Sequence, residues 1–156
     1  MSRHTIIIDL DNCMFDTHGT EGPKGCFYPE VREVIASIAD KHKLVLLTFS
    51  NNRSRQWEKI MSGDVAHFFW MIDIVEEGAG KFPVMDALKR IPSPHGSKSI
   101  IVVGDRLDQE ILHANVLGYT SVRVRRGKYR TLEPKSQYQV PEHTITNFRE
   151  LLPILQ

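Results

Sequence analysis

The sequence is 156 residues long, with 41% hydrophobic residues, 25% charged residues and a formal net charge of +1. A chain of this size and composition is most simply one soluble globular domain over residues 1–156. The small net charge argues against specific nucleic-acid or membrane-surface binding, and no apolar run reaches the roughly 20 residues that span a bilayer. Cys13 and Cys26 have no metal-binding spacing, so we expect reduced thiols and a cytoplasmic location.

The first predicted element is a buried strand at residues 6–8, followed directly by Asp9 and then by Asp11. A continuous run of β-branched apolar residues is typical of a strand buried on both faces. Residues i and i+2 of an extended segment point the same way, so Asp9 and Asp11 are expected to face one small volume. Two facing carboxylates repel each other unless a cation or a shared proton relieves them. The alternative is an acidic pair in a solvated loop or a helix cap.

Beyond this strand, the hydrophobic pattern predicts helices and strands in alternation. Polar loops are expected at residues 16–29 and 127–143. Buried strands are expected at residues 43–48, 68–75, 99–103 and 121–124. Helices are expected after Pro29, from a cap at Ser54, from Lys81, up to Gly118, and from a cap at Asn147. This alternation predicts an α/β fold of three layers, with helices on both sides of a mostly parallel sheet.

Polar residues end several of these elements. Asp9 and Asp11 follow the first strand, and Thr48 ends the second. Asp105 follows a later strand, and Lys81 begins a helix. The carboxyl ends of parallel strands lie at one edge of a sheet, so these side chains are expected to meet there. Carboxylates with one hydroxyl and one ammonium suit phosphoryl transfer through an aspartate, because Mg²⁺ cancels the repulsion between carboxylate and phosphate.

Four stretches of the sequence resemble the motifs of the haloacid dehalogenase (HAD) superfamily of phosphatases. IIIDLDN is similar to the first motif, DxDx, and LVLLT is similar to the second, an apolar strand ending in Thr or Ser. Lys81 is similar to the third-motif lysine, and IIVVGDRLDQEI resembles the fourth motif, GDxxxxD. The four motifs occur in the family's order. The resemblance covers essentially the whole chain and implies a Rossmann-like core.

The resemblance implies a role for each of these residues. Asp9 would be the nucleophile that becomes an aspartyl phosphate. Asp11 would be the general acid for the leaving group and then the base for the hydrolytic water. Thr48 would hydrogen-bond a phosphoryl oxygen, and Lys81 would neutralise the negative charge. Asp105 would bind Mg²⁺ together with Asp9 and the backbone carbonyl of Asp11.

Backbone N–H groups are expected to complete the phosphate site. By the same resemblance they belong to Leu10, to Asp11 and to either Phe49 or Ser50. Position 11 is Asp rather than the Tyr that would indicate dehalogenation. This favours hydrolysis of phosphate esters, because a leaving alkoxide needs a proton and a halide does not.

The fourth motif departs from the family pattern at its final acidic position. Glu110 stands where the usual residue is Asp, and Asp108 is an alternative. The extra methylene of Glu110 is expected to shift a direct or indirect metal contact and to weaken Mg²⁺ binding.

Members of the superfamily usually insert a cap domain after the first motif or between the second and third. Here a short loop fills the first position, and residues 51–80 have the pattern of ordinary core, so no sizeable cap is expected. An open site is expected to favour bulky or macromolecular phosphates, or to be covered by a second subunit in a homo-oligomer. Small phosphorylated substrates remain an alternative.

A cluster of basic residues lies in the segment from Val122 to Arg130, which begins within the last predicted strand. It comprises Arg123, Arg125, Arg126, Lys128 and Arg130. The simpler interpretation is a solvated edge of the sheet, and the alternative is a basic rim that attracts an anionic substrate.

The sequence therefore predicts a Mg²⁺-dependent phosphomonoesterase that acts through an aspartyl phosphate on Asp9. One alternative is a HAD-fold binding or regulatory protein without turnover, which Glu110 would favour. Another is a phosphotransferase or phosphoprotein phosphatase.

Overall fold

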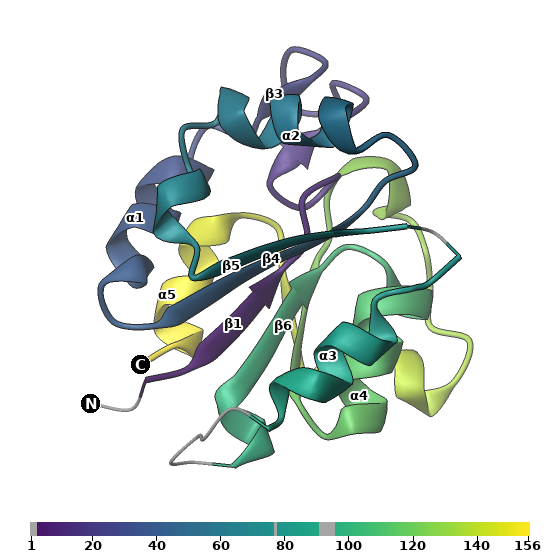
Figure 1. Ribbon diagram of the computed structural model, residues 1–156. Helices are drawn as coiled ribbons and strands as arrows, with labels where there is room; N and C mark the ends of the chain where they lie inside the picture. The colour runs from purple at the N-terminus through teal and green to yellow at the C-terminus, as the bar shows by residue number, and fades with distance from the viewer. Residues whose placement is uncertain (1–2, 77, 91–95) are drawn as a thin grey trace.

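The computed structural model describes residues 3–76, 78–90 and 96–156, which form an α/β fold around a six-stranded sheet (Figure 1). The strand order is β5-β4-β1-β6-β7-β8, and each neighbouring pair is parallel. These strands are β1 (Thr5–Ile8), β4 (Lys43–Phe49), β5 (Met71–Val75), β6 (Ile100–Gly104), β7 (Thr120–Val124) and β8 (His143–Ile145). The predicted fold class is confirmed, and β1, which leads into Asp9, lies between β4 and β6.

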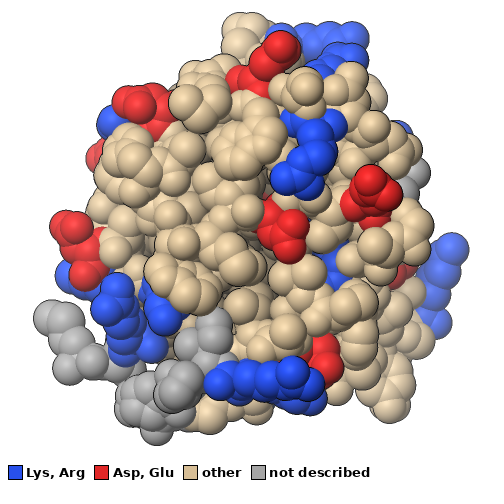
Figure 2. All heavy atoms as spheres, viewed as in Figure 1, with Lys and Arg blue, Asp and Glu red and all other residues tan. Residues whose placement is uncertain are grey.

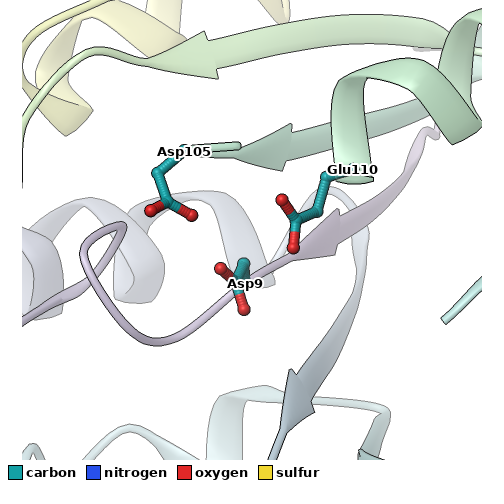
Figure 3. A group of neighbouring side chains, drawn as sticks. All are labelled: Asp9, Asp105 and Glu110. Atoms are coloured by element: carbon teal, nitrogen blue, oxygen red, sulfur yellow. The ribbon is translucent and has the colours of Figure 1, made fainter. Parts of the chain in front are cut away.

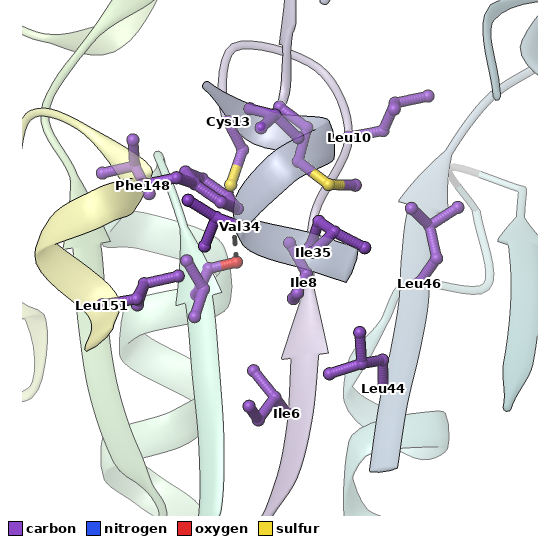
Figure 4. Close-up of a cluster of buried hydrophobic side chains, with 14 of the residues drawn as sticks. Ile6, Ile8, Leu10, Cys13, Val34, Ile35, Leu44, Leu46, Phe148 and Leu151 are labelled. Carbon is purple, nitrogen blue, oxygen red and sulfur yellow. Dashed lines mark hydrogen bonds between the residues drawn. The ribbon is translucent and has the colours of Figure 1, made fainter. Parts of the chain in front are cut away.

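Helices cover both faces of the sheet. They are α1 (Val31–Ala39), α2 (Arg53–Ser62), α3 (Phe82–Leu88), α4 (Leu112–Leu117) and α5 (Leu151–Ile154). Ile6 and Ile8 pack with α1 and α5 on one face, whereas Ile7 packs with α3 and α4 on the other. Side chains alternate across a strand, so a run of three isoleucines serves two cores. Figure 4 shows the first core, to which the buried side chain of Cys13 contributes.

Helix α2 begins beside a different cap from the predicted one. The side chain of Asn52 accepts a hydrogen bond from the N–H of Arg55, so Ser54 lies within the helix. The buried residues of α2 are Gln56 and Ile60, whereas Met61 is 63% exposed. Met61 points outward because the helix has one narrow buried face.

The predicted loop at residues 16–29 contains a small antiparallel hairpin, formed by β2 (Phe15–Asp16) and β3 (Cys26–Phe27). Phe15 and Phe27 meet edge to face with 5.5 Å between ring centroids. Phe27 also lies against Gly63 at the end of α2, where a Cβ would come within 2.6 Å of its ring. The hairpin is therefore fixed on α2. Between β1 and α1, this hairpin is the only regular secondary structure in the described residues.

The C-terminal part contains one strand that the sequence pattern did not predict. Strand β8 has three residues, of which Ile145 alone is buried, and such a short segment has no readable alternation. The cap at Asn147 is confirmed: its side chain accepts from Arg149 N–H, and Glu150 completes a capping box. Leu151 of the following helix is buried, whereas Leu152 is 39% exposed.

Short helical turns occur along the whole chain. They are η1 (Ala66–Phe68), η2 (Ser97–Ser99), η3 (Leu107–Ile111, π-helical), η4 (Gly127–Tyr129), η5 (Gln137–Gln139) and η6 (Phe148–Glu150).

The surface of the face seen in Figure 2 carries basic and acidic side chains interspersed with uncharged ones, in keeping with the small net charge. Among the described helices, none combines the length and apolar character needed to cross a bilayer.

Candidate active site

Three buried carboxylates converge at the carboxyl edge of the sheet (Figure 3). Asp9 follows β1, Asp105 follows β6, and Glu110 lies in the π-helical turn η3. One carboxylate oxygen of each lies within 4.8 Å of the others. The parallel pairing of β1 with β6 brings the first two together, as predicted from their positions at strand ends.

Lys81 is the cation at the centre of this group. It is the N-cap residue of α3 and is 1% exposed. Its Nζ donates to Asp9 Oδ1 at 2.7 Å and to Glu110 Oε1 at 2.6 Å. Lys81 thus joins two carboxylates, while Asp105 completes a set of three acidic groups around one lysine.

The burial of these groups shifts their protonation. Burial raises the pKa of Asp9 to about 6, with repulsion from Glu110 adding to the rise and Lys81 opposing it. Burial, together with repulsion from Asp9 and Glu110, also raises the pKa of Asp105 well above its ordinary value. Burial alone would lower the pKa of Lys81, but attraction to Asp9 and Glu110 outweighs it and leaves that pKa raised. The site therefore has excess negative charge that a further cation would relieve.

The donor set fits a hard divalent cation. All three side chains offer carboxylate oxygens, which Mg²⁺ prefers over nitrogen or sulfur ligands. Asp9 and Asp105 belong to the predicted metal ligands, and Glu110 joins them. Asp108, the alternative at this position, instead forms an ion pair with Arg106 (Nη2 to Oδ2, 2.7 Å) and lies outside the three-carboxylate group.

A second network links Thr48 with Asp11. Thr48, the next-to-last residue of β4, is buried, and its Oγ1 accepts a hydrogen bond from Gln56 Nε2 at 2.8 Å. The same Nε2 donates to Asp11 Oδ2 at 3.2 Å, and Lys59 Nζ donates to Asp11 Oδ1 at 3.1 Å. Gln56 and Lys59 are three residues apart on α2, so they reach the loop from one helix face.

The loop after β1 is tightly turned. The carbonyl of Leu10 accepts from the N–H groups of Cys13, Met14 and Phe15, and the Leu10 side chain is fully buried. Leu10 is not among the residues that line the neighbouring cavity, and a contact between its N–H and phosphate stays a prediction. Phe49, the last residue of β4, lines the site, whereas the N–H of Ser50 already donates to Val75 O.

These side chains line a cavity of about 290 Å³. Six predicted residues of the site line its wall: Asp9, Asp11, Thr48, Lys81, Asp105 and Glu110. Ser50 and Asp108 are not among the lining residues. The wall also includes residues that the sequence did not point to: Asn12, Thr17, His18, Arg106 and Tyr129. These come from loops, where no periodicity or motif marks a functional side chain.

Three members of the basic segment, Arg125, Lys128 and Arg130, are exposed, whereas the other two are buried. Arg123 and Arg126 are each 4% exposed and bind internal partners. Arg123 Nη2 donates to the carbonyl of Leu132 at 2.7 Å, and Arg126 pairs with Glu21 and Glu30. Of the cluster, Lys128 alone lines the 290 Å³ cavity.

Comparisons with known proteins agree with this arrangement. Residues 80–151 match the family described as HAD-hydrolase-like. The chain is 32% identical over 133 residues to a glyceraldehyde 3-phosphate phosphatase from Methanopyrus kandleri, covering 83% of this chain and 56% of that protein. It is 33% identical over 105 residues to the protein of the same name from Methanocaldococcus jannaschii, covering 65% of this chain and 44% of that one. The chain therefore spans about half the length of these curated relatives.

The fold recurs in solved structures. A putative HAD-hydrolase from Bacillus subtilis, solved bound to magnesium, aligns over 100% of both chains with a TM-score of 0.78 and 11% identity. The parallel sheet and the carboxylates at its edge define an α/β domain with a candidate metal-binding site. The motifs and the matching relatives place it more narrowly. The chain belongs to the HAD superfamily.

Proposed function

We propose that the chain is a Mg²⁺-dependent phosphomonoesterase that acts through an aspartyl phosphate on Asp9. The observation that carries the proposal is the buried group of Asp9, Asp105 and Glu110 around Lys81. Relatives named as phosphatases support the same reaction class. Glu110 lies within the carboxylate group, which weakens the argument that it marks a protein without turnover.

In this mechanism, Asp9, Asp105 and Glu110 are the residues that would hold Mg²⁺. Bound Mg²⁺ would neutralise part of the phosphate charge, so that a carboxylate can approach it. An oxygen of Asp9 attacks the phosphorus, and the bond from phosphorus to the alkoxide oxygen breaks. Lys81 Nζ, which already contacts Asp9, stabilises the charge on the equatorial oxygens, and the Thr48 hydroxyl binds one of them.

Asp11 moves the protons. It gives a proton to the leaving alkoxide, then takes one from the water that attacks the phosphorus and regenerates Asp9. Its carboxylate lines the same cavity as Asp9. Gln56 and Lys59 hold it there through the hydrogen bonds described above. They are positioning residues that fix the direction of Asp11.

The relatives' name makes glyceraldehyde 3-phosphate the first substrate to test. A cavity of about 290 Å³ is at the small end of the usual ligand-site range, which suits a small phosphate ester. The open site expected from the sequence favoured bulky phosphates, whereas the cavity volume and the relatives' name favour a small one.

The experiment measures phosphate release from an aryl phosphate and from glyceraldehyde 3-phosphate, with and without Mg²⁺. The wild type is expected to turn over only with Mg²⁺, and Asp9→Asn to lose activity by at least about a thousandfold, as for removal of a nucleophile. Asp73→Asn, on β5 outside the cavity, is the matched control and should retain activity. Metal-independent turnover, or equal activity in Asp9→Asn, would contradict the proposal.

A further inference from the structure

A second cavity of about 350 Å³ lies beside the first, and its wall is rich in arginine. We call it the arginine pocket, defined by Arg125, Arg126, Gly127 and Arg130, with Glu21 as its one acidic lining residue. Nothing in the proposed hydrolysis of a simple monoester uses it.

The same two loops form both cavities. In the loop after β2, Thr17 and His18 line the catalytic cavity, whereas Thr20 and Glu21 line the arginine pocket. The two cavities therefore lie side by side along one loop.

The turn after β7 also contributes residues to both cavities. Lys128 and Tyr129 face the catalytic cavity, whereas Arg125 and Arg130 line the arginine pocket. Neighbouring residues of one turn thus bring positive charge to both cavities, and the turn forms a wall common to both.

This turn is fixed to the loop that carries the catalytic aspartates. Gly127 has a φ of +74°, and a Cβ there would lie 2.8 Å from Cβ of Asn12 and 3.1 Å from the hydroxyl of Tyr28. Asn12 follows Asp11 directly. The close approach that glycine permits holds the arginine pocket at a set position relative to the catalytic cavity.

The three arginines of the pocket differ in burial and in the number of partners that they bind. Arg126 is buried, paired with Glu21 and Glu30, and lies 3.5 Å over the ring of Tyr28, so it is a structural residue. Arg125 and Arg130 are exposed. Each is steadied by one hydrogen bond to the turn itself: Arg125 Nε donates to Arg130 O, and Arg130 Nη1 donates to Gly127 O.

Most of the donors of these two side chains stay available. A guanidinium has five N–H groups. Within the described residues, the further contact of Arg125 is with Glu133 at 3.5 Å, and the Glu133 side chain is 75% exposed. Planar guanidinium groups bind phosphate through paired hydrogen bonds. Two such groups, held in place but unsaturated, suit a phosphate better than a neutral ligand.

We propose that the arginine pocket binds a second phosphoryl group of the substrate, so that the preferred substrates are bisphosphorylated small molecules. One phosphate would lie against Asp9 and Lys81 and be hydrolysed, while the other would bind Arg125 and Arg130. This inference rests on the proposed function, because it assigns the substrate class of that site.

The test compares matched pairs that differ by one phosphate: fructose 6-phosphate with fructose 1,6-bisphosphate, and 3-phosphoglycerate with 2,3-bisphosphoglycerate. Isothermal titration in Mg²⁺ measures the affinity of Asp9→Asn for each, and kcat/KM is measured with the wild type. For at least one pair, the wild type is expected to have a kcat/KM for the bisphosphate about tenfold or more above that for the monophosphate. Arg130→Ala and Arg125→Ala are each expected to lower this bisphosphate-to-monophosphate ratio by about tenfold.

Arg32→Ala is the control, because Arg32 is an exposed arginine paired with Asp64 and lines neither cavity. A bisphosphate-to-monophosphate ratio near one for both pairs would overturn the inference. So would a ratio that Arg130→Ala and Arg125→Ala lower no more than Arg32→Ala does. Failure of the proposed function has a different signature: the wild type hydrolyses nothing, while the binding preference is still measurable.

Discussion

Gly104 and Glu110 are in direct contact: a Cβ built on Gly104 would lie 2.7 Å from both Cβ and Cγ of Glu110. The side chain of Glu110 thus crosses over the end of β6 to reach Lys81. The extra methylene of the fourth-motif glutamate is accommodated because residue 104 has no side chain. The expectation that glutamate weakens Mg²⁺ binding assumed a displaced carboxylate. With this contact, the Glu110 carboxylate still lies beside those of Asp9 and Asp105.

Gly104→Ala is therefore expected to displace Glu110. The new methyl group would destabilise the fold by about 1–3 kcal/mol, as overpacking does, and would lower Mg²⁺ affinity. Urea unfolding and a Mg²⁺ titration monitored by thermal shift measure the two effects. Gly78→Ala is the matched control, because a Cβ there meets nothing within 4 Å. Unchanged Mg²⁺ affinity in Gly104→Ala would show that Glu110 has no part in the metal site.

The hydrogen bonds from Gln56 and Lys59 predict a second effect. Gln56→Ala removes a donor shared by Thr48 and Asp11, so kcat is expected to fall by about ten- to a hundredfold, as for a misplaced catalytic group. Lys59→Met is expected to act in the same direction by freeing the carboxylate of Asp11. Glu58→Gln, exposed on the same helix, should leave kcat unchanged. Steady-state kinetics that show a change in KM alone would contradict a positioning role.

The pair of Arg126 and Glu30 predicts a large effect on stability. Both side chains are 3% exposed, and the pKa of Glu30 is lowered because hydrogen bonds and attraction from Arg126 outweigh the effect of burial. Arg126→Met leaves a buried carboxylate without its cation and is expected to cost about 3–5 kcal/mol. Arg149→Met breaks the exposed pair with Glu33 and is expected to cost less than about 1 kcal/mol. Equal losses in denaturant unfolding would contradict this difference.

The raised pKa of Asp9 predicts how Mg²⁺ binding depends on pH. Because this pKa is about 6 in the folded protein, Asp9 holds a proton below pH 6 that the metal must displace. As pH rises above the ordinary carboxyl pKa, the metal-free fold loses stability relative to the unfolded chain until Asp9 is ionised, near pH 6. The increase in Tm that Mg²⁺ produces is therefore expected to be larger at pH 7.5 than at pH 5. Thermal shift at both pH values measures it, and an equal increase would contradict the prediction.

The fold and the catalytic edge could be predicted because they depend on local patterns. The isoleucines of β1 and the polar residues after each strand are visible in sequence, and parallel pairing alone brings Asp9 and Asp105 together. Gln56 and Lys59 could not be predicted, since a polar residue on a helix gives no sign of which loop it will contact. The cap at Asn52 was missed because Ser54 is an equally good capping residue by type.

The basic segment illustrates a different limit. Five basic residues in and after β7 suggested an exposed edge, but Arg126 is buried because Glu21 and Glu30 approach it from segments 105 and 96 residues away. Charge in sequence does not indicate exposure when the partner is distant along the chain. The small hairpin at β2 and β3 was missed for a similar reason, because each strand has two residues and depends on contact with α2.

The most direct test of the account is chemical trapping of the covalent intermediate. During turnover of an aryl phosphate in Mg²⁺, sodium borohydride is added and the digested protein is analysed by mass spectrometry. Borohydride reduces an acyl phosphate to the alcohol, so the account predicts conversion of Asp9 to homoserine only when both substrate and Mg²⁺ are present. Active turnover without reduction at Asp9, or with reduction at another carboxylate, would contradict it.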